Sequence, residues 1–243
     1  MMVRAIFARV LLGAFCGLTA CDPPGKPGRN IEVPRPDEVL DARLLFQQNC
    51  TGCHGAEGKL GPAMVIGDPV YLAIADDIIL RRTISKGRRG TAMTAFAQSE
   101  GGMLTAQQID SIIQGIRQRW GQGQTLKGVI LPPYEAKSPG NAQQGAIVFA
   151  KFCASCHGPD GKGRAEIGSI VDGNYLSLIS DQGLRTVVIV GRPDFNAPDW
   201  RSNLPGHPMT DAEITDVVAW LVAQRPKPLV APSVTSPVPG ETH

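Results

Sequence analysis

Two cysteines and a histidine occur close together twice in this sequence of 243 residues. The first group is Cys50-Thr51-Gly52-Cys53-His54, and the second is Cys153-Ala154-Ser155-Cys156-His157, 103 positions later. Two thiols three residues apart can add to the two vinyl groups of a porphyrin, and the adjacent imidazole can then ligate its iron. The pattern therefore predicts two covalently bound haem c groups, with His54 and His157 as the proximal iron ligands.

Two other kinds of site use the same residue types. A Cys-x-x-Cys pair in an oxidising compartment can close a disulfide, and four cysteines can build a tetrahedral zinc site. Neither alternative explains why a histidine follows the second cysteine in both motifs. We therefore favour haem attachment, and the disulfide and the zinc site remain the alternatives.

Composition and charge are compatible with a folded chain of two domains. Apolar residues make up 42% of the sequence, and the formal net charge is +2. Two of the basic residues, Arg4 and Arg9, lie in an N-terminal segment that we expect to be removed. The remaining charges balance, so nothing in the composition suggests binding to nucleic acid.

The N-terminal segment resembles a bacterial lipoprotein signal peptide. Residues 1–20 have a basic start and an apolar core too short to span a membrane as a mature helix. The segment ends in Leu18-Thr19-Ala20-Cys21, which is similar to a lipobox. We therefore expect Cys21 to be lipidated and the protein to lie on the periplasmic side of a bacterial membrane, with Asp22 slightly favouring the inner membrane. Ordinary cleavage that leaves Cys21 as a free thiol is the alternative.

A shift of 103 to 105 positions aligns the sequence with itself well beyond the two motifs. The matched residues include Phe46 with Phe149, Tyr71-Leu72 with Tyr175-Leu176, Gly87 with Gly191, and Leu104 with Met209. A tandem duplication explains this similarity. It predicts two domains of the same fold.

The duplication suggests where the domains begin and end. We expect a first domain at 38–120 and a second domain at 140–225. The remaining segments are a tether at 21–37, a linker at 121–139 and a disordered, proline-rich tail at 226–243. In the linker, the apolar run Val129-Ile130-Leu131 and Tyr134 are expected to lie against a domain surface.

Each repeat is predicted to begin and end with a helix. The first helices are expected at about 37–49 and 142–152, where they run into the cysteine motifs. The last helices start at capping boxes, in which a hydroxyl and a side chain three residues later cap each other. The capping pairs are Thr105 with Gln108 and Thr210 with Glu213, and the apolar stripes that follow are Ile109, Ile112, Ile113 and Ile116, and Ile214, Val217, Val218 and Leu221. We interpret both stripes as core.

The motifs and the helices around them resemble class I cytochrome c domains. The whole chain resembles a dihaem cytochrome c lipoprotein of the bacterial periplasm, and the likeness covers about residues 38–120 and 140–225. It implies an all-α fold in which each small helical domain wraps around one covalent haem.

The family's first and last helices cross where a glycine meets an aromatic residue. Gly145, Phe149 and Trp220 match this pattern in the second repeat. Ala42 and Gly115 stand at the matching places of the first repeat. The pattern therefore predicts this crossing for the second repeat, and the first repeat departs from it.

The resemblance also implies a sixth iron ligand for the first haem. Gly90-Thr91-Ala92-Met93-Thr94-Ala95-Phe96 resembles the family's methionine loop, so Met93 is expected to ligate the iron through its thioether. Met64 and Met103 are the alternative ligands. Pro62 resembles the proline whose carbonyl accepts a hydrogen bond from the proximal imidazole.

The second repeat departs from this pattern in both places. Ala197 stands where the methionine is expected, and Ala165 stands where the proline is expected. Three alternatives remain for the sixth position of the second haem, namely His207, Met209, or a vacant or water-filled position. Without a methionine ligand, we expect the second haem to have the lower reduction potential.

The resemblance implies electron transfer rather than catalysis. We expect a membrane-tethered dihaem cytochrome that passes electrons between respiratory or photosynthetic partners, such as a quinol-oxidising complex, an oxidase, a reaction centre or a soluble cytochrome. The chain could also be a fixed subunit of a larger complex. A different alternative is an enzyme that turns over peroxide or a sulfur anion at the open position of the second haem, with Asp194, Asp199 and His207 as acid–base candidates.

A cluster of basic residues precedes the methionine loop. Its members are Arg81, Arg82, Lys86, Arg88 and Arg89. The cluster is interpreted either as a docking surface for an acidic partner or as a solvated charged face.

Overall fold

The computed structural model describes residues 34–121 and 126–226. It divides the chain into two units, residues 1–38 and residues 39–243. In the first unit only residues 34–38 are described, and they include a short 3₁₀ helix, η1 (Pro36–Glu38). The expected signal peptide, the expected lipidation site Cys21, most of the tether and nearly all of the tail lie outside the described residues.

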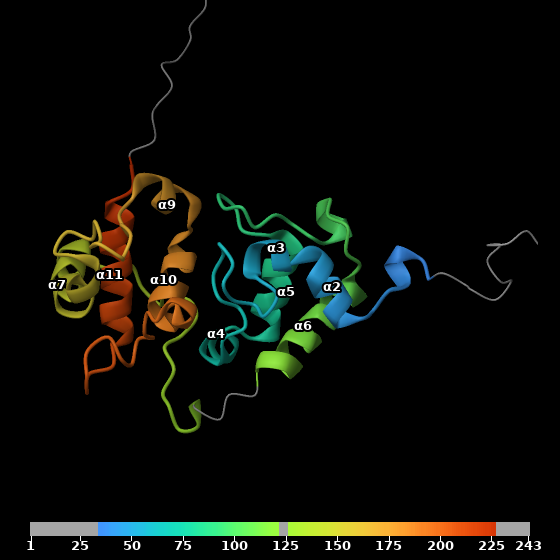
Figure 1. The fold of residues 1–243 in the computed structure, drawn as a ribbon, viewed down its shortest axis with the longest axis horizontal. Helices are drawn as coiled ribbons and strands as arrows, with labels where there is room; N and C mark the ends of the chain where they lie inside the picture. The colour runs from blue at the N-terminus through green and yellow to red at the C-terminus, as the bar shows by residue number, and fades with distance from the viewer. Residues whose placement is uncertain (1–33, 122–125, 227–243) are drawn as a thin grey trace, which may run out of the picture. The chain divides into compact units, whose positions relative to one another are not determined.

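The second unit is built from helices (Figure 1). The first repeat contains α2 (Ala42–Asn49), α3 (Thr51–His54), α4 (Pro69–Ile74), α5 (Asp77–Lys86), η2 (Gln98–Glu100) and α6 (Ala106–Trp120). The second repeat contains α7 (Ala142–Phe152), α8 (Ala154–His157), α9 (Gly173–Leu178), α10 (Asp181–Val190), η4 (Pro193–Phe195) and α11 (Asp211–Ala223). The described residues form isolated β-bridges but no strand, and none of their helices is both long and apolar enough to cross a membrane. The all-α fold is confirmed.

The first helix of each repeat leads into the cysteine motif. In the second repeat, α7 has the predicted bounds, and Asn141 caps it by accepting hydrogen bonds from the first turn of the helix. In the first repeat, the helix predicted at 37–49 begins only at Ala42. Asp41 caps it there, because its side chain accepts a hydrogen bond from the N–H of Leu44. The early start predicted for this helix was therefore wrong.

Both predicted capping boxes are present at the start of the last helices. The Thr105 hydroxyl accepts from the N–H of Gln108, and the Gln108 side chain accepts from the N–H of Thr105. Thr210 and Glu213 make the same two bonds. Behind these caps, the apolar stripes of α6 and α11 are buried, as predicted.

Each repeat also contains two inner helices, which the sequence analysis did not predict. They are α4 and α5 in the first repeat, and α9 and α10 in the second. Each begins at a side-chain cap, and the capping residues are Asp68, Asp76, Asp172 and Ser180. Because α5 packs on α6 and α10 packs on α11, these inner helices complete the core of each repeat.

The first and last helices of each repeat cross at a glycine. In the second repeat, a Cβ built on Gly145 would lie only 2.0 Å from the carbonyl oxygen of Asp216 and 2.7 Å from the Cβ of Trp220. In the first repeat the glycine is on the other helix, and a Cβ built on Gly115 would lie 2.6 Å from the Cβ of Ala42. The predicted crossing is confirmed in the second repeat, and the first repeat achieves it with the small residues exchanged.

An aromatic ring closes each crossing, but the two rings come from different positions in their helices. Trp220 stacks on Phe149 with ring centroids 4.2 Å apart. Trp120 meets the equivalent Phe46 edge-on at 5.2 Å. When the capping boxes are aligned, Trp220 corresponds to Gly115 and Trp120 corresponds to an arginine. The tryptophan therefore occupies different positions along the last helix in the two repeats, but it contacts the equivalent phenylalanine in both.

An arginine shows the reciprocal change. Arg117 of α6 and Arg225 after α11 donate to carbonyl groups at the C-terminal ends of α4 and α9, respectively. Each arginine also pairs with the first residue of the next helix, Asp77 or Asp181. The repeats thus make the same contacts with a tryptophan and an arginine that occur in opposite order along the chain.

The linker is packed against the hydrophobic core along part of its length. Tyr134 is buried in the main hydrophobic cluster, and Val129 and Leu131 pack against that cluster. Ile130 is 93% exposed. The prediction for the apolar run was therefore wrong for this residue, because neighbours in an extended segment point to opposite sides.

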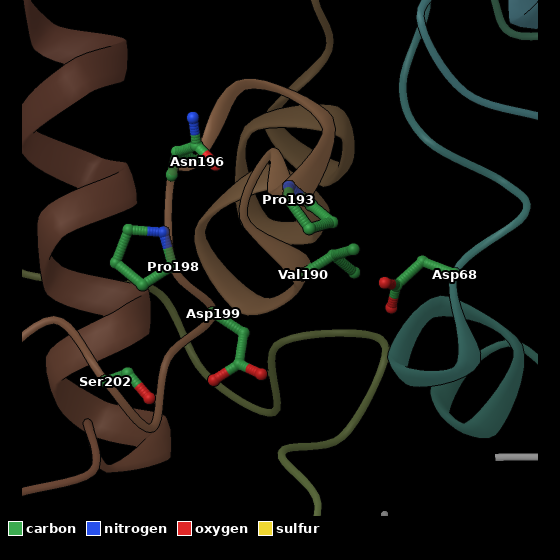
Figure 2. A pocket seen from close by; sticks show the side chains of 8 residues that line it. Asp68, Val190, Pro193, Asn196, Pro198, Asp199 and Ser202 are labelled. Carbon is green, nitrogen blue, oxygen red and sulfur yellow. The ribbon is translucent and has the colours of Figure 1, made fainter.

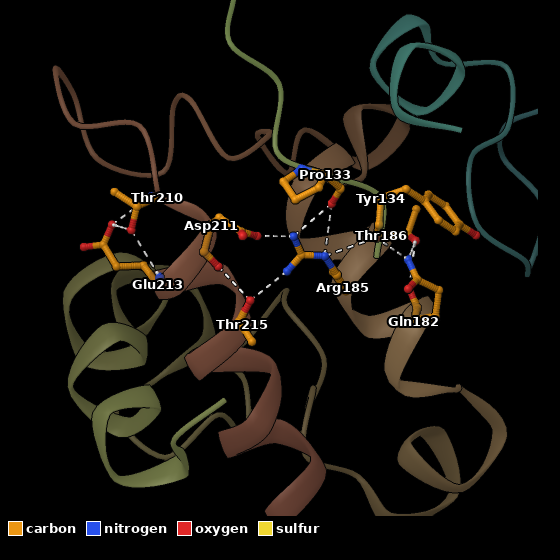
Figure 3. A network of polar contacts seen from close by, with 9 residues as sticks. All are labelled: Pro133, Tyr134, Gln182, Arg185, Thr186, Thr210, Asp211, Glu213 and Thr215. Carbon is orange, nitrogen blue, oxygen red and sulfur yellow. Dashed lines mark hydrogen bonds and ion pairs between the residues drawn. The ribbon is translucent and has the colours of Figure 1, made fainter. Parts of the chain in front are cut away.

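A buried arginine holds the linker in place (Figure 3). Arg185 of α10 is only 2% exposed and donates to the carbonyl groups of Pro133 and Tyr134. It also binds the carboxylate of Asp211 at the start of α11. From the first repeat, Arg88 donates to the hydroxyl of Tyr134. The linker is thereby bonded to both repeats.

Candidate haem-binding sites

A single helical turn holds each cysteine motif. Cys50 and Cys153 cap the turns α3 and α8 with nearly identical backbone angles, φ −119° and ψ −32° for Cys50 and φ −120° and ψ −31° for Cys153. In both turns the N–H of the histidine donates to the carbonyl oxygen of the first cysteine over 2.9 Å. The two thiols and the imidazole of each motif therefore leave one turn in the same arrangement.

The four motif cysteines are free thiols in the structure. Burial, with a smaller contribution from the neighbouring cysteine, raises the pKa of Cys50 to about 12 and that of Cys153 to about 11. Both thiols are thus protonated at neutral pH. Within the described residues there is no cluster of three or more His, Cys, Asp or Glu side chains that could hold a metal ion.

The proximal imidazole of the first motif is held by the main chain. Nδ1 of His54 lies 3.0 Å from the carbonyl oxygen of Met64, so Nδ1 carries the hydrogen and Nε2 keeps a lone pair for a metal. Burial lowers the pKa of His54, which favours the neutral ring that ligation needs. The prediction that the Pro62 carbonyl accepts this bond was wrong. The N–H of Ala63 donates to the carbonyl of Cys53, and the carbonyl of Met64, two residues after Pro62, is the one that faces the ring.

The proximal imidazole of the second motif has no such support. Nδ1 of His157 is buried and has no hydrogen-bond partner within the described residues. Burial lowers its pKa. The loop after the motif takes a different course, in which the N–H of Gly163 donates to the carbonyl of His157. The two sites therefore differ on their proximal sides.

The loop that carries Met93 has the same course in both repeats. The N–H of Arg88 donates to the carbonyl of Met93 over 2.8 Å, and the N–H of Arg192 donates to the carbonyl of Ala197 over 3.1 Å. Both loops open at a glycine with positive φ, where a side chain would meet the loop backbone. Ala197 therefore occupies the place of Met93, and its methyl group cannot ligate iron.

Known protein families match the two repeats separately. Residues 142–224 match the family described as cytochrome c, and residues 37–114 match cytochrome c oxidase, cbb3-type, subunit III. Each matched segment contains one cysteine motif and the helices around it. The chain contains two cytochrome c domains in tandem. These matches confirm the predicted resemblance of the two repeats to cytochrome c domains.

Relatives of the tandem cytochrome c are named as oxidase subunits. The CcoP subunit of the cbb3-type cytochrome c oxidase from Azospirillum sp. (strain B510) is 30% identical over 146 residues, covering 56% of this chain and 44% of the relative. The CcoP subunit from Cereibacter sphaeroides is 27% identical over 187 residues, covering 73% and 58%. The one from Rubrivivax gelatinosus is 33% identical over 153 residues, covering 62% and 43%. The chain thus spans about half the length of these relatives.

The residues of both motifs fit a covalent haem. Each motif supplies two unpaired thiols and an imidazole that burial favours in its neutral form. This is the donor set of one haem c. The tandem cytochrome c holds two haem c groups, one for each motif.

Met93 remains the predicted sixth ligand of the first haem, and the structure argues against its two alternatives. Met103 is 71% exposed. The main chain of Met64 lies on the Nδ1 side of the His54 ring. The carbonyl of Met64 is thus used to orient the proximal ring.

The two candidate ligands of the second haem lie in different surroundings. His207 is exposed, with Nε2 3.3 Å from Nζ of Lys151 and 3.5 Å from Oε1 of Glu213. Met209 is 3% exposed and belongs to the hydrophobic core, at the place that Leu104 has in the first repeat. His207 and Met209 therefore both have contacts within the protein. A vacant or water-filled sixth position is the third alternative for the second haem.

The acid–base candidates of the enzyme alternative are engaged elsewhere. Both carboxylate oxygens of Asp194 lie 2.9 Å from the Arg192 guanidinium, which holds the pKa of Asp194 below its ordinary value. Asp199 accepts hydrogen bonds from Arg201, and His207 lies beside Lys151 and Glu213 as described above. The enzyme alternative gains no support from these contacts.

Three of the five basic residues before the methionine loop are bound within the protein. Two of them, Arg82 and Arg88, reach the linker, and Arg81 reaches α6. The pairs are Arg81 with Asp110, Arg82 with Glu135, and Arg88 with Tyr134. These contacts favour a structural role for the three arginines over a docking surface.

A cavity of about 320 Å³ has Ala197 in its wall. Figure 2 shows it between Asp68 and the loop that carries Pro193 and Pro198. It is bounded on one side by Asp68, which caps α4 of the first repeat. The remaining lining residues come from the second repeat and are Val190, Pro193, Asn196, Ala197, Pro198, Asp199 and Ser202. Burial raises the pKa of Asp68, although its hydrogen bonds with the first turn of α4 act in the opposite direction.

Sequence reasoning missed the polar contacts between the two repeats. Asp194, considered only as an acid–base candidate, accepts a hydrogen bond from the N–H of Leu60 over 2.9 Å. Arg192 donates to the carbonyl of Gly61 over 3.2 Å. The sequence does not predict these contacts, because the partners in the first repeat are main-chain groups, which every residue carries.

Proposed function

We propose that the tandem cytochrome c is a membrane-tethered electron carrier on the periplasmic side of a bacterial membrane. It passes single electrons between respiratory or photosynthetic redox partners. The observation that carries this proposal is the presence of two attachment motifs of matching backbone geometry in one folded unit. A bound haem c supplies one-electron exchange between ferric and ferrous iron.

The chain's own residues position and shield the two sites. Four cysteines attach the groups, and the bond from His54 to the Met64 carbonyl orients the first proximal ring. The buried stripes of α6 and α11 supply apolar walls that exclude water. Met93 is the proposed sixth ligand of the first haem. Ala197 leaves the second to His207, to Met209 or to a vacant position.

The proposed partners follow from the relatives and from the chemistry. The relatives named above are cbb3-type oxidase subunits, which supports an oxidase as one partner. A quinol-oxidising complex, a reaction centre or a soluble cytochrome would serve as the other. The protein acts either as a free-standing carrier or as a fixed subunit of such a complex.

The proposed tether is a lipid on Cys21, which lies outside the described residues. The Leu18-Thr19-Ala20-Cys21 pattern supports it. Replacing Cys21 by Ser is expected to release the protein from the membrane fraction. The same fractionation of the unaltered protein is the control, and equal distributions of both proteins would refute the lipid anchor.

The electron-carrier proposal is tested on protein made in a host that matures c-type cytochromes. We expect the mass of the polypeptide plus two haems, and reversible oxidation by membranes that contain a cbb3-type oxidase. Replacing Cys50 and Cys53 by Ala should leave one haem. A colourless product with the bare polypeptide mass would refute haem attachment, and a haem-loaded product that exchanges no electrons with any of the proposed partners would refute the carrier role.

A further inference from the structure

An ion pair of the second repeat is withdrawn from water at the contact with the first repeat. Nε and Nη2 of Arg192 each lie 2.9 Å from a carboxylate oxygen of Asp194. The Asp194 side chain has no exposed surface, and that of Arg192 is 22% exposed. A bidentate pair of this kind has a defined geometry and can orient the groups bonded to it.

The pair binds the main chain of the first repeat just after its cysteine motif. Oδ2 of Asp194 accepts from the N–H of Leu60 over 2.9 Å, and Nη2 of Arg192 donates to the carbonyl of Gly61 over 3.2 Å. Because both partners are main-chain groups, these bonds constrain the conformation of the loop.

The bound loop has a strained backbone. Leu60 has φ +64°, in the left-handed region, which is unfavourable for a residue with a side chain. The equivalent residue of the second repeat is Gly163, which has φ +92° and no such penalty. The hydrogen bond from Leu60 to Asp194 helps to hold a conformation that leucine alone disfavours.

The other side of the same loop contacts the proximal histidine. A Cβ built on Gly61 would lie 2.2 Å from the carbonyl oxygen of Cys53, so this loop passes directly over the motif. Three residues after Gly61, the carbonyl of Met64 accepts the bond from Nδ1 of His54. A hydrogen bond at Nδ1 makes the imidazole a stronger electron donor to a metal, which favours the ferric state and lowers the reduction potential.

We propose that Arg192 and Asp194 are positioning residues for the proximal ligand of the first haem. By holding Leu60 and Gly61, they keep the Met64 carbonyl in contact with His54, so the second repeat helps to set the reduction potential of the first haem. This inference rests on the proposed electron-carrier function. It adds that the two sites are coupled through the protein.

The second haem lacks the corresponding arrangement. Nδ1 of His157 has no hydrogen-bond partner within the described chain. Arg88, the equivalent of Arg192, donates instead to Thr83 and Tyr134. Loss of the Arg192–Asp194 pair is therefore expected to affect the two haems unequally.

The test uses the full-length, haem-loaded protein with Asp194→Ala. Each haem is titrated by its own low-temperature EPR signal, and amide hydrogen exchange is measured over residues 58–66. We expect the midpoint potential of the first haem to rise more than that of the second. Exchange in the loop should become roughly tenfold faster, since one buried hydrogen bond is lost. Asp194→Asn, which keeps an acceptor for Leu60, should give a smaller change in both measurements.

The matched control is Asp181→Asn, which removes one carboxylate from the second repeat. Asp181 is paired with Arg225 within that repeat. It should leave the loop exchange unchanged and should not reproduce the unequal shift. Equal shifts of both haems in Asp194→Ala, or unchanged exchange at residues 58–66, would overturn the inference. Haem content and electron exchange with membranes are measured on the same variants, so the carrier proposal is judged separately.

Discussion

Gly145 and Trp220 lie so close together that a Cβ on the glycine would be 2.7 Å from the Cβ of the tryptophan. The carbonyl oxygen of Asp216 would be closer still, at 2.0 Å. Main-chain atoms of α11 cannot move aside as a flexible side chain can. The stacking of Trp220 on Phe149 therefore depends on a residue without a side chain in α7.

Gly145→Ala is expected to destabilise the protein by about 1–3 kcal/mol, because the added methyl group forces α7 and α11 apart. Chemical denaturation followed by circular dichroism measures this change. Gly168→Ala is the control, since nothing lies within 4 Å of a Cβ at that glycine. If both variants lose the same stability, the close crossing does not limit residue 145.

Substitutions at Met93 and at the equivalent Ala197 should remove or add the optical band that marks a methionine-ligated haem. Met93→Ala is expected to abolish the near-infrared sulfur-to-iron band of the first haem and to lower its midpoint potential. Ala197→Met is expected to add a second band and to raise the potential of the second haem, because Ala197 and Met93 hold the same place in their loops.

Optical spectra of the oxidised variants check this prediction. Met103→Ala is the matched control for Met93→Ala, because Met103 is largely exposed, and it should leave the band intact. A band that survives in Met93→Ala would show that another methionine is the ligand.

Arg185→Met should cost about 3 kcal/mol, because it leaves Asp211 and two linker carbonyls without their buried partner. The denaturation midpoint should fall accordingly. Lys162→Ala removes a cation from an exposed pair with Asp160 and should change stability by less than about 1 kcal/mol. Similar losses in the two variants would contradict a special role of Arg185 in holding the linker.

Asp68 should make the stability depend on pH with a sign opposite to that of most carboxylates. Its pKa in the folded protein is raised above the ordinary 3.8, chiefly by burial. The folded state therefore retains the proton to higher pH than the unfolded chain, and stability falls as the pH rises between the two pKa values. Asp68→Asn keeps a good helix cap but does not titrate.

The measured quantity is the difference in unfolding free energy between the unaltered protein and Asp68→Asn. As the pH rises above 3.8, the unaltered protein should lose stability relative to Asp68→Asn. A difference that grows in favour of the unaltered protein with rising pH would mean that the hydrogen bonds to Val70 and Tyr71, not burial, dominate the pKa of Asp68.

The features that could be predicted from the sequence are those written within a few consecutive residues. The cysteine motifs, the capping boxes at Thr105 and Thr210, and the apolar stripes behind them were all confirmed. The helix at 142–152 was also found with the predicted bounds. Such signals are local, because each depends on a spacing of three or four residues.

The features that could not be predicted depend on how distant segments meet. The acceptor for His54 is Met64 and not Pro62, because the course of the loop depends on the bond between Ala63 and Cys53. The contact of Asp194 with Leu60 joins residues 134 positions apart and uses a main-chain donor. The inner helices were missed although their capping residues, such as Asp68, are visible in the sequence.

The two tryptophans reach equivalent phenylalanines from sites five residues apart along their helices, and Arg225 stands at the site that Trp120 has in the first repeat. An alignment of the two repeats by sequence position would score these tryptophans and arginines as mismatches. The two repeats share the space that a tryptophan fills and the carbonyl groups that an arginine binds, although these residues come from different positions. The common origin of the two repeats is therefore clearer from their contacts than from the residues at aligned positions.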